Sequence, residues 1–231
     1  MGELAIAGLT PLTTIDFPDH LACVVFCQGC PLRCGYCHNP DLVDCRKAGQ
    51  LPWQAVKGFL LRRQGLLDGV VFSGGEPTVQ NGLSQAIDEV SALGFRVALH
   101  SAGTHPRQLA AVLGKLDWVG LDVKALPEDS LKVTGVARSG VKNWQSLEMV
   151  QHSGVAFECR TTVHPALLTA DQLRTLAGRL RDQGVRRYAL QWVRGTRMLD
   201  SSLGLAMLSE EWLETIQEIQ SWFPQFEFRR D

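Results

Sequence analysis

This 231-residue chain places four of its seven cysteines in one short stretch, Cys27-Gln-Gly-Cys30-Pro-Leu-Arg-Cys34-Gly-Tyr-Cys37-His-Asn-Pro40. Glycine, proline and arginine fill the spaces between the cysteines, so the stretch has neither the period of an amphipathic helix nor the alternation of a strand. Burial of apolar surface therefore does not explain the clustering. The pattern predicts a loop whose thiols hold a metal or redox centre.

Three kinds of site compete for these thiols. A structural zinc site could use Cys27-x2-Cys30 with Cys34-x2-Cys37, but only three residues separate the pairs, whereas such zinc modules place about 15–20 residues there. A redox dithiol at one pair leaves the other cysteines unexplained. An iron–sulfur cluster with three cysteine ligands is the third kind of site. Because a [4Fe–4S] cluster ordinarily takes four thiolates, three would leave one iron open for a substrate or cofactor.

The sequence around this loop alternates between strand and helix patterns about six times, with short connections. Residues 20–26, just before the cysteines, are nearly continuously apolar, which is typical of a strand covered on both faces. Alternation of this kind predicts a parallel sheet with right-handed crossovers, either doubly wound or a barrel. The expected strands are 20–26, 69–73, 95–99, 118–121, 155–162, 187–192 and a weak 227–229; the expected helices are 53–67, 83–93, 106–114, 143–152, 169–183 and 209–222.

Two further features complete this outline. Residues 3–9 and 11–18 have β character interrupted by Pro11 and Pro18, and residues 125–141 are expected to be irregular. No linker or low-complexity stretch divides the chain, so we expect one domain over 1–231 with its core at about 19–195.

Bulk properties exclude several classes of partner. The formal net charge is −1, which gives no electrostatic reason to expect binding to nucleic acid or to an anionic membrane. The N-terminus lacks the basic and apolar regions of a signal peptide, and no segment offers the roughly 18 apolar residues of a membrane span. Seven cysteines without an export signal indicate a reducing compartment. We therefore expect a cytoplasmic protein.

Unusual residues follow the expected strands. They are Cys30 to Cys37, Gly74-Gly75-Glu76-Pro77, Ser101 and Asp122-Val-Lys124. Because ligand sites of parallel α/β folds lie at the carboxyl ends of the strands, these residues are predicted to share one site.

The cysteine spacing, with Tyr36 before the last cysteine, resembles the signature of the radical S-adenosylmethionine (radical SAM) enzymes. The longer run Gly29–Pro40 and the N-terminal segment Gly8-Leu-Thr-Pro-Leu-Thr-Thr-Ile-Asp-Phe-Pro18 resemble the branch that activates glycyl radical enzymes. Within it the sequence is most similar to activating proteins of anaerobic ribonucleoside-triphosphate reductase, and next to pyruvate formate-lyase activating enzymes. The resemblance extends from about residue 5 to about residue 195.

The resemblance implies a partial (β/α)6 barrel, of the TIM-like radical SAM type, and two cofactors, a [4Fe–4S] cluster and S-adenosylmethionine. Cys30, Cys34 and Cys37 would hold the cluster, whose open iron would chelate S-adenosylmethionine. One electron would then cleave the sulfonium to methionine and a 5′-deoxyadenosyl radical. In activases this radical takes a hydrogen atom from a glycine Cα of a partner enzyme.

Other residues carry over by position as contacts of S-adenosylmethionine. Tyr36 and His38 would border the adenine, and the run Gly74-Gly75-Glu76 would meet the methionine amino group. Glycines permit close backbone approach, and a carboxylate accepts hydrogen bonds from an ammonium group. Asp122 would bind the ribose hydroxyls and Lys124 the methionine carboxylate.

The sequence departs from the family after the third expected strand. Leu99-His100-Ser101-Ala102-Gly103 aligns with a Leu-Asp-Thr-Asn-Gly pattern. Ser101 would bind the methionine carboxylate or the ribose, but His100 replaces an aspartate associated with a monovalent cation in activases. That cation site is therefore in question. Cys23, Cys45 and Cys159 lack partners at ligand spacing, and Cys27 is expected to pack at a strand end.

The function predicted from these resemblances is generation of a glycyl radical on a partner, with anaerobic ribonucleotide reductase first among candidates. A flavodoxin- or ferredoxin-type protein would supply the electron. The short chain leaves little room for a substrate domain, which suits a protein substrate. Two alternatives stay open: a radical SAM enzyme acting on a small molecule, similar to 7-carboxy-7-deazaguanine synthase, and a structural metal-binding protein without catalysis.

Overall fold

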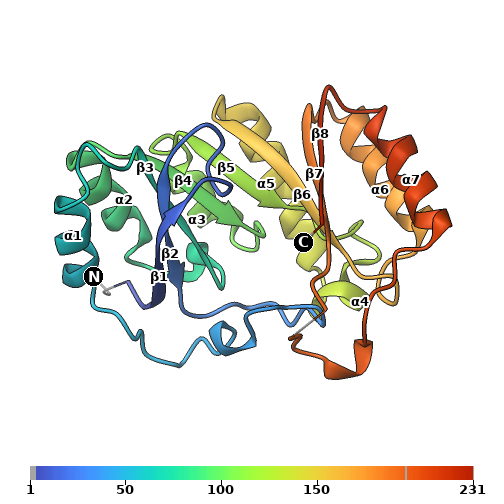
Figure 1. The fold of residues 1–231 in the computed structure, drawn as a ribbon, viewed down its shortest axis with the longest axis horizontal. Helices are drawn as coiled ribbons and strands as arrows, with labels where there is room; N and C mark the ends of the chain where they lie inside the picture. Colours follow the sequence, from blue (N-terminus) through green and yellow to red (C-terminus); the bar gives the residue numbers. More distant parts are fainter. Residues whose placement is uncertain (1–3, 196, 231) are drawn as a thin grey trace.

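Eight strands form one sheet in the computed structural model, which describes residues 4–195 and 197–230 (Figure 1). The strands are β1 Ile6–Thr13, β2 Ala22–Cys27, β3 Gly69–Gly74, β4 Arg96–Ser101, β5 Trp118–Asp122, β6 Ala156–Val163, β7 Arg187–Trp192 and β8 Gln225–Arg229. The helices are α1 Trp53–Leu61, α2 Leu83–Ala92, α3 Pro106–Leu113, α4 Ser130–Thr134, α5 Ser139–Ser153, α6 Ala170–Asp182 and α7 Glu210–Gln220, with 3-10 turns η1 Pro40–Leu42, η2 Pro77–Val79 and η3 Ser201–Leu203.

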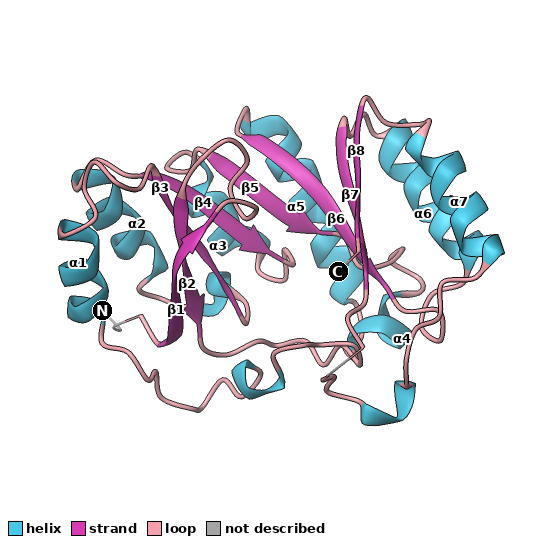
Figure 2. Ribbon diagram, in the orientation of Figure 1, coloured by secondary structure: helices cyan, strands magenta, loops and turns pink. Residues whose placement is uncertain are grey.

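The strands lie in the sheet in the same order as in the sequence, from β1 to β8. The strands from β2 to β8 are parallel, whereas β1 is antiparallel to β2. A doubly wound sheet reverses its strand order at a switch point, and this sheet does not. The helices other than α4 consequently line the outer side of the curved sheet, from α1 at one end to α7 at the other, while α4 lies at the lower ends of the strands (Figure 2). The partial barrel is confirmed, and the terminal strand expected at 227–229 is β8.

Both faces of the central strands are buried, as their continuous apolar sequences predict. Along β2, Cys23, Val25 and Cys27 join the large core between sheet and helices. The alternate residues Ala22 and Val24 pack on the inner side. At about 25 cal/mol per Å² of buried apolar surface, this two-sided burial is the main stabilising term of the sheet.

A hydrogen-bonded ion network fills the inner side of the later strands. Arg160 on β6 donates from Nε to Glu158 at 2.9 Å, and Arg229 on β8 lies 3.0 Å from the same carboxylate. The Arg160 guanidinium also stacks on Trp118, 4.9 Å from the ring centroid. It occupies the space over Gly120, where a Cβ atom would lie 2.7 Å from the guanidinium carbon. Glycine on β5 thus makes room for the arginine on β6.

Helix signals in the sequence agree with most observed boundaries. Thr169 caps α6 in a complete capping box with Gln172. The interval 125–141, expected to be irregular, contains the short helix α4 and the start of α5. Among the helices of residues 4–195 and 197–230, none is long and apolar enough to cross a membrane.

Candidate active site

The carboxyl ends of the strands surround a cavity of about 190 Å³. That volume is many times what one water molecule needs, so the cavity can admit a larger ligand. Ten of the eleven residues predicted from the sequence line it: Cys30, Cys34, Tyr36, Cys37, His38, Gly74, Gly75, Ser101, Asp122 and Lys124. Glu76, the eleventh, lies behind the wall rather than in it, with its side chain fully buried.

The cysteine loop is held in place by backbone hydrogen bonds to three other segments. Gly29 donates from N to Leu42 O at 2.8 Å, and Arg33 from N to Thr134 O at 2.7 Å. Leu199 donates from N to Cys37 O at 3.1 Å. In Figure 1 this loop runs along the lower edge of the sheet toward the segment containing η3. The contact with residues 199–203 was not predicted, because nothing in the sequence pairs segments so far apart.

The three predicted ligand thiols fit a cluster better than a single metal ion. Cys34 is buried, and Cys30 and Cys37 are half-buried against it in one small apolar group. Within the described ranges, no three His, Cys, Asp or Glu side chains converge closely enough to hold one ion. A single zinc requires that convergence, whereas in a [4Fe–4S] cluster each thiolate binds a different iron. Cys27, at the end of β2, is fully buried in the helix–sheet core, as its predicted packing role requires.

Burial disfavours the thiolate form of Cys30 and of Cys34. Burial raises the pKa of Cys30 to about 12, with the Glu76 carboxylate as a second cause. Burial also raises the pKa of Cys34, which Lys124 opposes. If these cysteines bind a cluster as thiolates, its loading would release protons.

Gly74 and Gly75 are required by backbone packing. Gly74 has φ +109, and a Cβ atom there would lie 2.5 Å from Cys27 N. A Cβ atom on Gly75 would overlap the carbonyl of Gly29, which accepts a 2.8 Å hydrogen bond from Glu76 N. These glycines therefore let the end of β3 approach the cysteine loop, whatever ligand they meet in the cavity.

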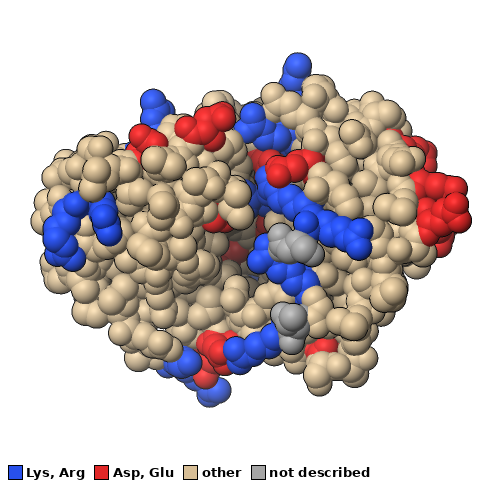
Figure 3. Space-filling view, viewed as in Figure 1, with Lys and Arg blue, Asp and Glu red and all other residues tan. Residues whose placement is uncertain are grey.

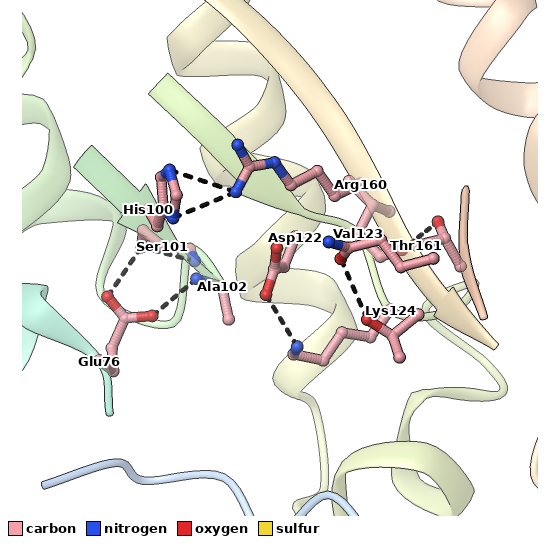
Figure 4. Close-up of polar contacts among 12 residues, drawn as sticks. Glu76, His100, Ser101, Ala102, Asp122, Val123, Lys124, Arg160 and Thr161 are labelled. Atoms are coloured by element: carbon pink, nitrogen blue, oxygen red, sulfur yellow. Dashed lines mark hydrogen bonds and ion pairs between the residues drawn. The ribbon is translucent and has the colours of Figure 1, made fainter. Parts of the chain in front are cut away.

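The Glu76 carboxylate joins the ends of β3 and β4 (Figure 4). Its Oε1 accepts hydrogen bonds from Ser101 Oγ at 2.7 Å and from Thr78 Oγ1 at 2.6 Å and N at 3.1 Å. Its Oε2 accepts one bond, from Ala102 N at 2.7 Å. Since a carboxylate oxygen has two lone pairs, Oε2 can accept another donor. Binding of an ammonium group by Glu76 stays a prediction, beside the structural role seen here.

Asp122 and Lys124 form an ion pair on the opposite side of the cavity. Lys124 Nζ lies 3.0 Å from Asp122 Oδ2, and the side chains are 15% and 32% exposed. Lys124 also lies over the Tyr36 ring, 5.7 Å from its centroid. Burial alone would lower the pKa of Lys124. The negative charge of Asp122 outweighs this effect and raises the pKa well above its usual value. The cavity therefore presents a cation and a carboxylate side by side, and their binding to a ligand stays a prediction.

His38 is fixed as a neutral imidazole by two backbone groups. Its Nε2 accepts from Arg194 N at 3.4 Å, so Nδ1 carries the proton that faces Arg197 O at 3.3 Å. Partial burial lowers the pKa of His38. The side chain lines the cavity while tying the cysteine loop to the segment after β7.

His100 is likewise neutral. Its Nε2 donates to Asp16 O at 2.8 Å, which leaves Nδ1 to accept from Arg160 Nη1 at 3.1 Å (Figure 4). Burial and the charge of Arg160 hold the pKa of His100 well below its usual value. A neutral imidazole beside a guanidinium offers no negative charge for a cation. Arg160 itself pairs with Glu158 and is 6% exposed.

Sequence reasoning missed four lining residues, Asn39, Val43, Ser73 and Thr162. Ser73 and Thr162 occupy strand ends, so their position in the expected strands was the available signal.

Figure 3 shows a hollow in this face of the molecule, with Lys and Arg side chains gathered along one wall.

Comparisons with known proteins agree with this arrangement. The family model described as Radical SAM superfamily matches residues 24–167. The chain is 29% identical over 198 residues to a Methanocaldococcus jannaschii protein assigned by name as a glycyl-radical enzyme activating enzyme, covering 80% of this chain and 78% of that protein. It is 32% identical over 179 residues to the pyruvate formate-lyase-activating enzyme of Clostridium pasteurianum, covering 74% of each.

Solved structures share the fold. SuiB of Streptococcus suis, bound to S-adenosylmethionine, superposes with a TM-score of 0.69 at 13% identity. The match covers 88% of this chain and 48% of SuiB, so the chain spans about half the length of that protein. QueE from Escherichia coli gives a TM-score of 0.60 at 18% identity, covering 99% of this chain and 95% of QueE. At these identities the likeness concerns the fold alone.

Proposed function

This chain belongs to the radical SAM superfamily, whose enzymes use a [4Fe–4S] cluster and S-adenosylmethionine, and we propose that it generates a glycyl radical on a partner enzyme. The observation that carries the proposal is the similarity to activating enzymes over about three quarters of both chains. The cavity supports it, because thiols, an acidic residue and a cation meet there at the ends of five parallel strands, β2 to β6.

The residues that line the cavity would act through the positions they already occupy, whereas Glu76 lies behind the wall and would have to be uncovered to meet a ligand. Cys30, Cys34 and Cys37 would hold the cluster, which when bound supplies the electron that cleaves the sulfonium. Glu76 Oε2 would accept from the methionine ammonium group, and Lys124 would pair with the methionine carboxylate. Asp122 would bind ribose hydroxyls beside it.

Tyr36 and His38 would border the adenine. Tyr36 is 4% exposed beneath Lys124, and His38 is held neutral by backbone groups. The half-buried His38 ring provides a flat surface on which a base could stack, whereas the buried Tyr36 would border the adenine largely through its backbone. Ser101 Oγ donates its proton to Glu76 at 2.7 Å and already accepts from Gly103 N at 2.9 Å, which leaves it one lone pair for a donor such as a ribose hydroxyl.

We propose anaerobic ribonucleoside-triphosphate reductase as the partner. The support is the resemblance of about residues 5–195 to the activating proteins of that reductase. A flavodoxin- or ferredoxin-type donor would deliver the electron.

The test is anaerobic incubation of the cluster-loaded, reduced protein with S-adenosylmethionine and a candidate reductase, monitored by paramagnetic resonance. The expected result is a glycyl-radical doublet, which is lost when the reductase carries alanine in place of its radical glycine. A pyruvate formate-lyase is the parallel candidate. If 5′-deoxyadenosine forms but no candidate gives the doublet, while a small molecule is turned over, the activase proposal is wrong.

A further inference from the structure

Helix α5 lies outside the cavity, yet three of its side chains donate to backbone carbonyls at the cavity wall. Asn143 donates from Nδ2 to Ala102 O at 3.0 Å and to Asp122 O at 2.8 Å. Ser146 donates from Oγ to Gly103 O at 2.8 Å, and Trp144 from Nε1 to Ala125 O at 3.2 Å. These carbonyls belong to the segments that leave β4 and β5.

The amide of Asn143 donates hydrogen bonds just beyond the end of the β4–β5 ladder. The ladder between β4 and β5 ends at the pair Ser101 and Leu121. Beyond it, the carbonyls of Ala102 and Asp122 would have no strand partner, and one buried amide group satisfies both. Asn143 is 6% exposed, so water does not compete freely for these bonds.

The turn Ser101–Gly103 is consequently held from two opposite sides. On one side its Ala102 N–H and Ser101 hydroxyl donate to Glu76. On the other side its carbonyls accept from α5. The contact with the helix is close, because a Cβ atom on Gly103 would lie 2.7 Å from the Ser146 Cβ atom.

We propose that Asn143 is a positioning residue for the cofactor site: its amide fixes the distance between the Ser101–Gly103 turn, which orients Glu76, and the backbone of Asp122. The inference rests on the proposed function only in taking both segments as contacts of S-adenosylmethionine. In metal sites, residues that orient the ligands typically change affinity by about 10- to 100-fold when they are removed, and we expect an effect at the low end of that range here.

The experiment measures the dissociation constant of S-adenosylmethionine by equilibrium dialysis with the cluster-loaded, oxidised protein, in which no turnover occurs. Asn143→Ala should raise that constant about tenfold, while iron content stays that of the unsubstituted protein. Gln151→Ala is the matched control. Gln151 lies on the same helix and also donates an amide bond to a backbone carbonyl, Gln183 O at 2.8 Å, but far from the cavity.

Ser146→Ala provides a second variant should Asn143→Ala fail to fold. It removes only the hydroxyl and its bond to Gly103, and should raise the dissociation constant several-fold. An unchanged constant in the folded variants, or an equal rise in Gln151→Ala, would overturn the inference, as would a wild-type protein that does not bind S-adenosylmethionine. Absence of a glycyl radical despite normal binding would instead refute the activase function and leave this inference standing.

Discussion

Replacing Glu76 by glutamine tests the hydrogen-bonded junction between β3 and β4. The carboxylate is fully buried and accepts four hydrogen bonds, three at Oε1 and one at Oε2. Glutamine retains one oxygen, so its least costly orientation keeps the Oε1 bonds and turns the amide nitrogen toward Ala102 N. Two donors then face each other, and a buried N–H loses its partner.

The expected loss of stability follows from that single mismatch. Leaving a buried donor unsatisfied costs about 1–3 kcal/mol, and the three retained bonds become weaker when the acceptor is neutral. Relief of the buried charge offsets part of this, so we expect Glu76→Gln to lower the free energy of unfolding by about 2 kcal/mol. Urea unfolding of the cluster-free protein measures it without any contribution from cofactor binding.

Thr78→Val is the matched control. It removes one donor of the same carboxylate, the 2.6 Å bond from Thr78 Oγ1, and leaves the bonds to Ser101 and Ala102 intact. Its expected cost is about 1 kcal/mol. If Glu76→Gln unfolds at the same urea concentration as the wild type, or if Thr78→Val costs as much as Glu76→Gln, the junction does not hold β3 to β4 as argued.

Three further outcomes are expected. Cys34→Ala should lose most of the iron taken up on anaerobic reconstitution, whereas Cys45→Ser, at an exposed thiol, should retain it; equal iron in both would refute the ligand assignment. Gly75→Ala should destabilise the protein by about 2 kcal/mol in thermal unfolding, because the added methyl overlaps Gly29 O. Hydrogen bonds from Lys57 and Trp53 lower the pKa of Glu89 to about 2, below its usual 4.5, so this stabilisation exists above pH 4.5 and is lost as the pH falls toward 2. Glu89→Gln should therefore cost about 1 kcal/mol at pH 7 and nothing near pH 2, and a pH-independent difference would contradict this.

The order of strands and helices could be predicted because the local sequence determines it. The apolar run before Cys27 predicts β2, and Thr169 with Gln172 predicts the start of α6. These local patterns do not predict the order in which the strands lie in the sheet. A barrel and a doubly wound sheet use the same strand and helix patterns, and only the packing of consecutive crossovers distinguishes them.

The residues of the site likewise fall into two groups: those that the sequence identifies and those that only the structure shows. Cysteine spacing and strand ends identified the cavity lining because carboxyl ends of parallel strands meet at one edge. The sequence did not identify Asn143 and Leu199, because each contacts a residue that is distant from it in the sequence. Glu76 was identified as a site residue, but its four internal hydrogen bonds depend on where the β4 turn lies in space.

Hydrogen bonds connect the loops after four neighbouring strands to one another. Gly29, after β2, accepts from Glu76 N; Glu76, after β3, accepts from Ala102 N; and Asn143 bridges Ala102, after β4, to Asp122 at the end of β5. Every link except the Asn143 and Glu76 side chains is a backbone group, so a substitution breaks this chain of bonds only where it removes one of those two side chains or, as at Gly75, displaces the backbone. The Asn143 and Glu76 side chains are therefore the two places where the connection between the cysteine loop and Asp122 can be cut without moving the backbone.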